Sequence, residues 1–308
     1  MCAAPVLEGT NYPSLTSGHP ESSCTDILIV GLHVKVYGLD EIKGSKLPIA
    51  AVVATHGRCN KKEQMAYFAH GLLGAAVDAG KGKSRRRDVI VVTMDQRNHG
   101  SRLKDKKANL SYDENEHHLI DMAACITGGC HDVSLLMDFL AAYLFPDGER
   151  VIDEFIPTGI SLGGNLTWRL LREEPRIRIA IPIIGLPFSS FGPYLRARAE
   201  AMGLTWAPPL APPSIQHLTD VPLEAERYTG KKILSIHGAA DELVPIRQGQ
   251  KDLDGIKALI GDGLEVWVVD GVGHAVTAEM AKRTGEWVWR WALSEQSEQG
   301  VEETKSRY

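Results

Sequence analysis

Residues 154–174 read EFIPTGISLGGNLTWRLLREE. The first eight are rich in apolar and β-branched types and predict a buried strand, whereas the remainder predicts a helix. Between them lies Gly159-Ile160-Ser161-Leu162-Gly163, which puts a serine at the turn from strand to helix. Such a turn brings the residues two before and two after the serine close together, and glycine at both places avoids a Cβ clash. The stretch therefore predicts a serine hydroxyl that stands above the end of a strand.

The chain around this stretch alternates between short apolar runs and helical stretches. Residues 27–38 predict a strand pair. Residues 114–145 are expected to be mainly helical with a break near Gly128-Gly129, and the last helix is expected over 275–293. Further strands are predicted at 49–57, 88–95, 177–185, 232–238 and 264–270. This alternation is typical of an α/β fold with a mostly parallel sheet and helices on both faces.

The pattern also suggests how the chain is organised. Residues 1–25 are expected to form an irregular arm, and 297–308 a polar C-terminal tail. The core is expected to comprise 26–185 and 231–296. Between them, 186–230 contain the proline-rich run LTWAPPLAPPSIQHL. A connection this long is usually functional, so we interpret 186–230 as a small cap or lid; a surface excursion without a substrate role is the alternative.

Composition limits the partners and the compartment. Hydrophobic residues make up 44% of the 308 residues and charged residues 24%, as in ordinary globular proteins. The net charge of −5 gives no reason to bind nucleic acid or an anionic membrane, and we interpret the basic run from Lys81 to Arg87 as a solvated loop. We find no signal peptide and no uninterrupted apolar run of the ~20 residues needed to span a bilayer. Five scattered cysteines fit a reducing compartment, so a cytoplasmic location is expected.

Two residues downstream of Ser161 are candidates for a base and its orienting acid. A serine hydroxyl becomes a good nucleophile when a histidine held by a carboxylate removes its proton. Asp241 follows the strand predicted at 232–238, and His274 follows the one at 264–270. Catalytic roles are therefore predicted for Ser161, Asp241 and His274. The competing acids are Glu242, Asp220, Asp252 and Asp270.

Several motifs resemble those of a known superfamily. They are H-G-x-x-D-x-x-V-P at 237–245, G-x-G-H at 271–274, T-H-G-R at 55–58 and D-x-R-N-H-G at 95–100. Together with G-x-S-x-G they resemble the α/β-hydrolase superfamily, and the combination is similar to its prolyl-oligopeptidase-like and dienelactone-hydrolase-like esterases. The resemblance covers roughly 49–293. It implies the α/β-hydrolase fold, with an eight-stranded sheet, and an oxyanion hole formed by the backbone N–H groups of Arg58 and Leu162.

The expected activity is that of a serine esterase that forms an acyl-enzyme on Ser161 and hydrolyses a carboxylic ester. A lactonase, thioesterase or peptidase with the same triad is the alternative, as is a slow-turnover ligand receptor on this fold. No cofactor and no metal are expected, because no Cys/His/Asp/Glu cluster has ligand spacing. The expected partner is a small-molecule acyl substrate, and a homodimer is left open. The substrate pocket is predicted to include Gly57, Phe188, Phe191, Tyr194, Met202 and Trp206.

Overall fold

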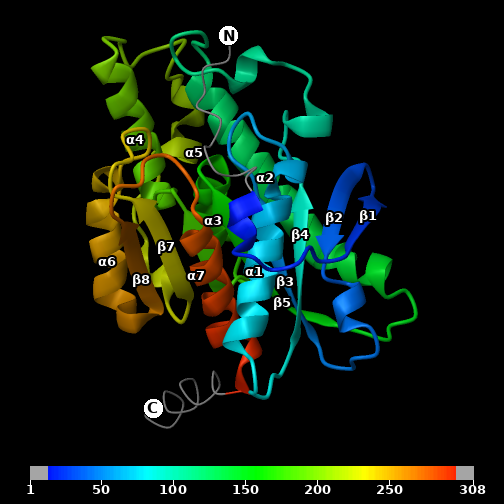
Figure 1. The fold of residues 1–308 in the computed structure, drawn as a ribbon. Helices are drawn as coiled ribbons and strands as arrows, with labels where there is room; N and C mark the ends of the chain where they lie inside the picture. The colour runs from blue at the N-terminus through cyan, green and yellow to red at the C-terminus, as the bar shows by residue number, and fades with distance from the viewer. Residues whose placement is uncertain (1–12, 296–308) are drawn as a thin grey trace.

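One eight-stranded sheet forms the centre of the protein, as seen in a computed structural model that describes residues 13–295. Its strand order is β1-β2-β4-β3-β5-β6-β7-β8 (Figure 1). The strands β1 and β2 form an antiparallel hairpin, β2 pairs antiparallel with β4, and the remaining pairs are parallel. The strands are β1 (Cys24–Ile29), β2 (Leu32–Tyr37), β3 (Ile49–Thr55), β4 (Asp88–Met94), β5 (Ile152–Ile160), β6 (Ile179–Ile183), β7 (Lys232–Gly238) and β8 (Leu264–Val269).

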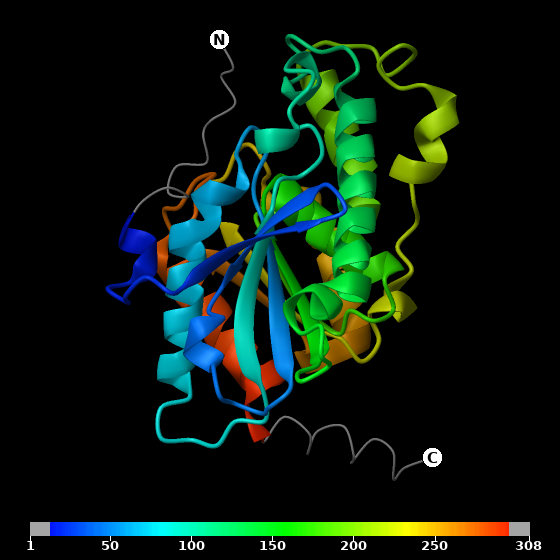
Figure 2. The same cartoon turned by 90° about the vertical axis from the view of Figure 1, so that its right-hand side faces the viewer.

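Helices cover both faces of this sheet. Figure 2 shows α1 on one side and α2 on the other, and all residues of β3 and β4 between them are buried. Strands buried on both faces read as continuous apolar runs, which is why these two could be predicted. The helices are α1 (Ala66–Ala79), α2 (His118–Leu144), α3 (Leu162–Glu173), α4 (Phe188–Ala201), α5 (Gln216–Thr219), α6 (Gln250–Ile260) and α7 (Ala278–Val288).

The helix α2 corrects one prediction. It runs without a break through Gly128-Gly129, because these glycines allow close packing instead of ending the helix. A Cβ at Gly128 would lie 2.2 Å from Cδ of Arg97, and one at Gly129 would lie 2.3 Å from Cδ1 of Leu166. By length and composition α2 is also long and apolar enough to cross a membrane, although the sequence has no uninterrupted apolar run of that length. Here 61% of its most apolar window is buried inside the protein.

The other elements lie close to their predicted places. The last helix begins later than expected, where the Thr277 side chain accepts a hydrogen bond from the Met280 N–H, and it continues as a π-helix over Trp289–Leu293. The cysteines at 24, 125 and 130 carry free thiols. Residues 1–12 of the expected arm and the whole expected tail, 297–308, lie outside the described residues.

Candidate active site

Ser161 lies at the turn between β5 and α3. Its backbone has φ 57° and ψ −107°, a region that non-glycine residues enter only at a cost of about 1–3 kcal/mol. The turn is tight: a Cβ at Gly159 would lie 2.4 Å from the Gly163 carbonyl oxygen, and one at Gly163 would lie 2.4 Å from the Thr55 carbonyl oxygen. Surrounding packing thus holds the serine in a strained conformation at the carboxyl end of a central strand.

Replacing Gly163 by alanine should destabilise the protein by about 3 kcal/mol, because the added methyl group meets fixed backbone of β3. The midpoint of urea unfolding measures this loss. Gly255→Ala in α6 is the matched control, since its new Cβ would meet only the end of the Leu223 side chain, at 2.9 Å. Equal stability of Gly163→Ala and wild type would contradict the close approach at this turn.

The imidazole of His274 joins Ser161 to Asp241. Nε2 of His274 lies 3.0 Å from Oγ of Ser161, and Nδ1 of His274 lies 2.8 Å from Oδ2 of Asp241. Asp241 follows β7 and His274 follows β8, so both come from carboxyl ends of strands on the same side of Ser161 in the sheet order. The three side chains predicted from sequence are therefore in direct hydrogen-bonding contact.

Asp241 is held as an ionised acceptor. The residue is 3% exposed, and its Oδ1 accepts hydrogen bonds from the N–H groups of Leu243 and Val244, both at 2.8 Å. Burial alone would raise the pKa of this carboxyl, but the hydrogen bonds from His274 and from these two amides hold the pKa below its ordinary value. The carboxylate can therefore receive Nδ1–H of His274 and favour an imidazolium.

The competing acids have other surroundings. Glu242 is exposed and pairs with Arg247 at 3.0 Å. Asp252 accepts hydrogen bonds from Ser189 and Ser190 of α4, both at 2.6 Å. Asp220 follows α5 and Asp270 lies exposed after β8. Asp241 is the carboxylate in contact with His274.

The residues predicted to supply backbone donors are Leu162, directly after the serine, and Arg58, in the loop after β3. Leu162 is the first residue of α3, and the first N–H groups of a helix have no hydrogen-bond acceptor within the helix. The Leu162 N–H can therefore bind an oxyanion. In the loop after β3, Nε2 of the buried His56 ring accepts a hydrogen bond from the Gln96 N–H at 3.1 Å. The proton of the neutral ring is therefore on Nδ1, which donates to the Gly57 carbonyl at 2.8 Å. Because a trans peptide points its C=O and N–H in opposite directions, this bond fixes the direction of the Arg58 N–H.

This positioning of the Gly57–Arg58 peptide was missed by the sequence analysis. Burial lowers the pKa of His56 to about 4, so the ring is neutral and keeps one donor and one acceptor at neutral pH. Gln96 adds a side-chain hydrogen bond to the His56 carbonyl. His56 stands in the T-H-G-R motif at 55–58 and Gln96 in the D-x-R-N-H-G motif at 95–100. Their contact could not be read from these motifs, because it follows from the pairing of β3 with β4. The Arg58 guanidinium donates to the Asn109 carbonyl at 2.6 Å.

Comparison with known proteins bears on the fold. Neither the protein-family models nor the curated proteins searched give a match. Among solved structures, TT1662 from Thermus thermophilus superposes with a TM-score of 0.63 at 21% identity, over 87% of this chain and 97% of its own. The chain has the α/β-hydrolase fold.

Two further α/β-hydrolase structures are similar. Est1E from Butyrivibrio proteoclasticus, solved with bound ferulic acid, gives a TM-score of 0.55 at 15% identity, over 91% of this chain and 99% of its own. The acylaminoacyl peptidase of Pyrococcus horikoshii gives 0.55 at 15% identity over 88% of this chain, which spans 41% of that protein.

The residues predicted to form the substrate pocket differ in exposure. Phe188 and Phe191 open α4, stack on each other with ring centroids 5.6 Å apart and are fully buried. Tyr194 is also buried, and its hydroxyl donates to the Leu243 carbonyl at 2.6 Å. Met202 is 45% exposed and Trp206 is half-buried. Gly57 is buried. The pocket assignment stays a prediction.

Within residues 13–295, no group of three or more His, Cys, Asp or Glu side chains is placed to hold a metal ion.

Proposed function

We propose that this protein is a serine hydrolase that cleaves a carboxylic ester through an acyl-enzyme on Ser161. One observation carries the proposal: the continuous hydrogen-bonded path from Oγ of Ser161 through His274 to Asp241, at 3.0 and 2.8 Å. A serine with an adjacent base and a buried orienting acid is the arrangement that activates a hydroxyl for acyl transfer.

The proposed reaction has two halves. Oγ of Ser161 attacks the ester carbonyl carbon while Nε2 of His274 takes the hydroxyl proton, and the N–H groups of Leu162 and Arg58 stabilise the oxyanion. His274 then gives the proton to the leaving alkoxide, which departs as an alcohol. Water attacks the acyl-enzyme with His274 again as base, and the acid product leaves as Ser161 regains its proton. Asp241 stabilises the imidazolium in both halves.

An ester is favoured among acyl bonds by the solved structures that share the fold. Est1E has ferulic acid bound, and Pyrococcus furiosus supplies a protein named an esterase, Pf2001, at a TM-score of 0.50 and 18% identity. The acylaminoacyl peptidase shows that the same fold also carries a protein named a peptidase. We place this chain with the esterases and expect lactones, thioesters and peptides to be slower substrates.

Turnover of a p-nitrophenyl ester series tests the function. Wild-type protein should release p-nitrophenol in multiple turnovers, and in competition an ester should outpace the lactone, thioester and peptide of the same acyl group. Preference for one of those three would reassign the substrate class while keeping the machinery. A single stoichiometric release without turnover would identify a ligand receptor and overturn the hydrolase proposal.

Chelation should leave the activity unchanged. The proposed steps use only side chains and backbone amides, so dialysis against EDTA should not alter kcat or KM for the best ester. Mock-dialysed protein is the control. A loss of activity that a divalent ion restores would contradict this prediction.

Trp206 should help to select the substrate, if residues 186–230 act as a cap. The hydrogen bond from Tyr194 to Leu243 joins α4 of this segment to the loop that carries Asp241, which supports placing the segment beside the site. Trp206→Ala should change the ratio of kcat/KM between short and bulky esters by about tenfold or more. Phe139→Ala, which removes an exposed ring from α2, should not. Equal losses for all esters would mean that Trp206 serves stability alone.

A further inference from the structure

The strand β8 ends the sheet with an apolar edge. Among the described residues 13–295 it pairs only with β7, and Val266 and Val268 in its middle are 36% and 38% exposed. The residues 264–269 read LEVWVV, with no proline and no lysine. Edge strands usually carry a proline, a lysine or a bulge, because these prevent the open row of backbone donors and acceptors from pairing with another chain.

The open backbone groups of β8 can be identified. The Val269 carbonyl accepts from the Ala239 N–H at 2.9 Å, so the backbone of Val269 points toward β7. Direction alternates along a strand, and Val268 and Val266 therefore point their N–H and C=O groups away from the sheet. The next outward carbonyl, that of Leu264, is already taken by Nζ of Lys257 at 2.7 Å. The open stretch is thus short and bounded at one end.

The geometry points to a second copy of this chain as the partner: we propose that two β8 strands pair antiparallel about a two-fold axis at Trp267, joining the two sheets into one. In this register the outward groups of Val266 face those of Val268 in the other copy and exchange hydrogen bonds, twice over by symmetry. A two-fold interface requires that the strand be complementary to itself, and the spacing of Val266 and Val268 about Trp267 meets that condition. The proposal is independent of the chemistry at Ser161.

The charges at the two ends of β8 fit the same register. Pairing about Trp267 places Leu264 opposite Asp270 of the other copy. Lys257 is held at Leu264 with its side chain 50% exposed, and its Nζ lies 4.0 Å from the carboxylate of the fully exposed Asp262. Asp270 is also exposed. Each copy then brings a cation to one end and an anion to the other, so two Lys257–Asp270 pairs form across the axis. Within one chain the two residues lie at opposite ends of the strand, about 20 Å apart at roughly 3.3 Å per residue.

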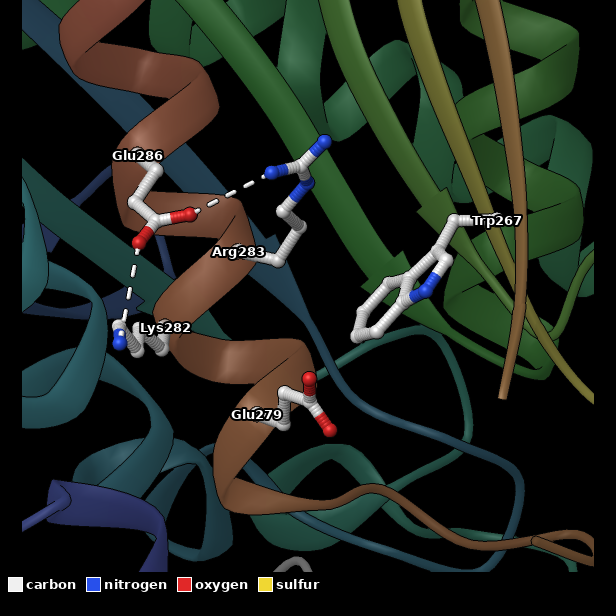
Figure 3. A pocket seen from close by; sticks show the side chains of 5 residues that line it. All are labelled: Trp267, Glu279, Lys282, Arg283 and Glu286. Atoms are coloured by element: carbon white, nitrogen blue, oxygen red, sulfur yellow. Dashed lines mark ion pairs between the residues drawn. The ribbon is translucent and has the colours of Figure 1, made fainter. Parts of the chain in front are cut away.

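On the face of β8 that lies toward α7, a hollow leaves room for the side chain of a second Trp267. Trp267 borders a hollow of about 280 Å³ that is also lined by Glu279, Lys282, Arg283 and Glu286 of α7 (Figure 3). Both cations of this lining are paired within the chain: Lys282 and Arg283 lie 4.0 and 3.6 Å from Glu286, and Arg283 also pairs with Glu265 of β8 at 2.6 Å. The two-fold axis brings a second Trp267 directly opposite the first, where its indole can cover this hollow.

Sedimentation equilibrium of the full chain over a wide range of concentration tests the proposal. Wild type should dimerise. Val268→Pro, which removes one outward N–H without touching the β7 ladder, should raise the dimer dissociation constant at least tenfold, and Val268→Ala, which keeps that N–H, should raise it much less. A monomer at every concentration, or a dimer equally strong in Val268→Pro, would overturn the proposal.

A charge swap tests the register and does not depend on how the proline variant folds. Lys257→Glu and Asp270→Lys should each raise the dissociation constant about tenfold, because each sets two like charges against each other. The double variant should regain most of the wild-type affinity, since both pairs are restored with reversed sign. Residues about 20 Å apart in one chain do not rescue each other within a monomer. Additive weakening in the double variant would contradict the two-fold register.

Discussion

Replacing Ser161 by alanine is expected to lower kcat for the best ester about 10⁴- to 10⁶-fold, with a melting temperature close to that of wild type. Alanine keeps the Cβ and hence the same backbone strain at φ 57°, so the substitution removes only the nucleophilic oxygen and its 3.0 Å contact with His274. Steady-state ester hydrolysis and a thermal melt measure the two effects separately.

The control for this experiment is Ser134→Ala. The Ser134 hydroxyl donates to Glu174 at 3.0 Å between α2 and the end of α3, far from the site in the fold, and its loss should leave kcat unchanged. If Ser161→Ala retained more than a small fraction of the wild-type rate after folding correctly, the nucleophile would have to be another group.

Replacing Asp241 by asparagine should lower kcat by about 10³–10⁴. The asparagine oxygen would keep the hydrogen bonds from Leu243 and Val244, which turns its NH₂ group toward Nδ1 of His274. That donor forces the proton onto Nε2, so the imidazole can no longer accept the proton of Ser161. The loss should appear in kcat more than in KM, because it concerns a charge that develops only in the transition state.

Two isosteric amide variants are matched controls for this loss. Glu242→Gln breaks only an exposed pair with Arg247, and Asp270→Asn neutralises an exposed carboxylate after β8. Both should keep most of the wild-type rate. An inactive Asp270→Asn together with an active Asp241→Asn would contradict the assignment of the acid while leaving the contact between Ser161 and His274 in place.

The sequence was informative where one short stretch determines the local structure. The glycines around Ser161 predict a tight turn because that turn is sterically closed to side chains, and the apolar runs before Asp241 and His274 predict strand ends that meet at one edge of the sheet. The eight-stranded sheet of the α/β-hydrolase fold was expected from resemblance, and its strand order was not predicted from any local pattern, because pairing between β3 and β5 joins residues about a hundred positions apart.

Errors arose where distant residues decide the outcome. Gly128-Gly129 was expected to break a helix, but Arg97 and Leu166 pack against it and require glycine. The basic run at 81–87 was expected to be solvated, yet Arg87 is buried and binds Asp153 of β5 at 2.7 Å. His56 was a motif residue without a role until the partner of its ring, Gln96, was known from the fold.

Labelling with a fluorophosphonate tests the central claim most directly. Folded wild-type protein should take up one equivalent, and peptide mass spectrometry should place the phosphonyl group on Ser161, because a serine activated by His274 attacks the phosphorus and displaces fluoride. The label should be absent from Ser161→Ala and greatly slowed in Asp241→Asn. A label on any other residue, or none on folded wild-type protein, would contradict the assignment of Ser161 as the nucleophile.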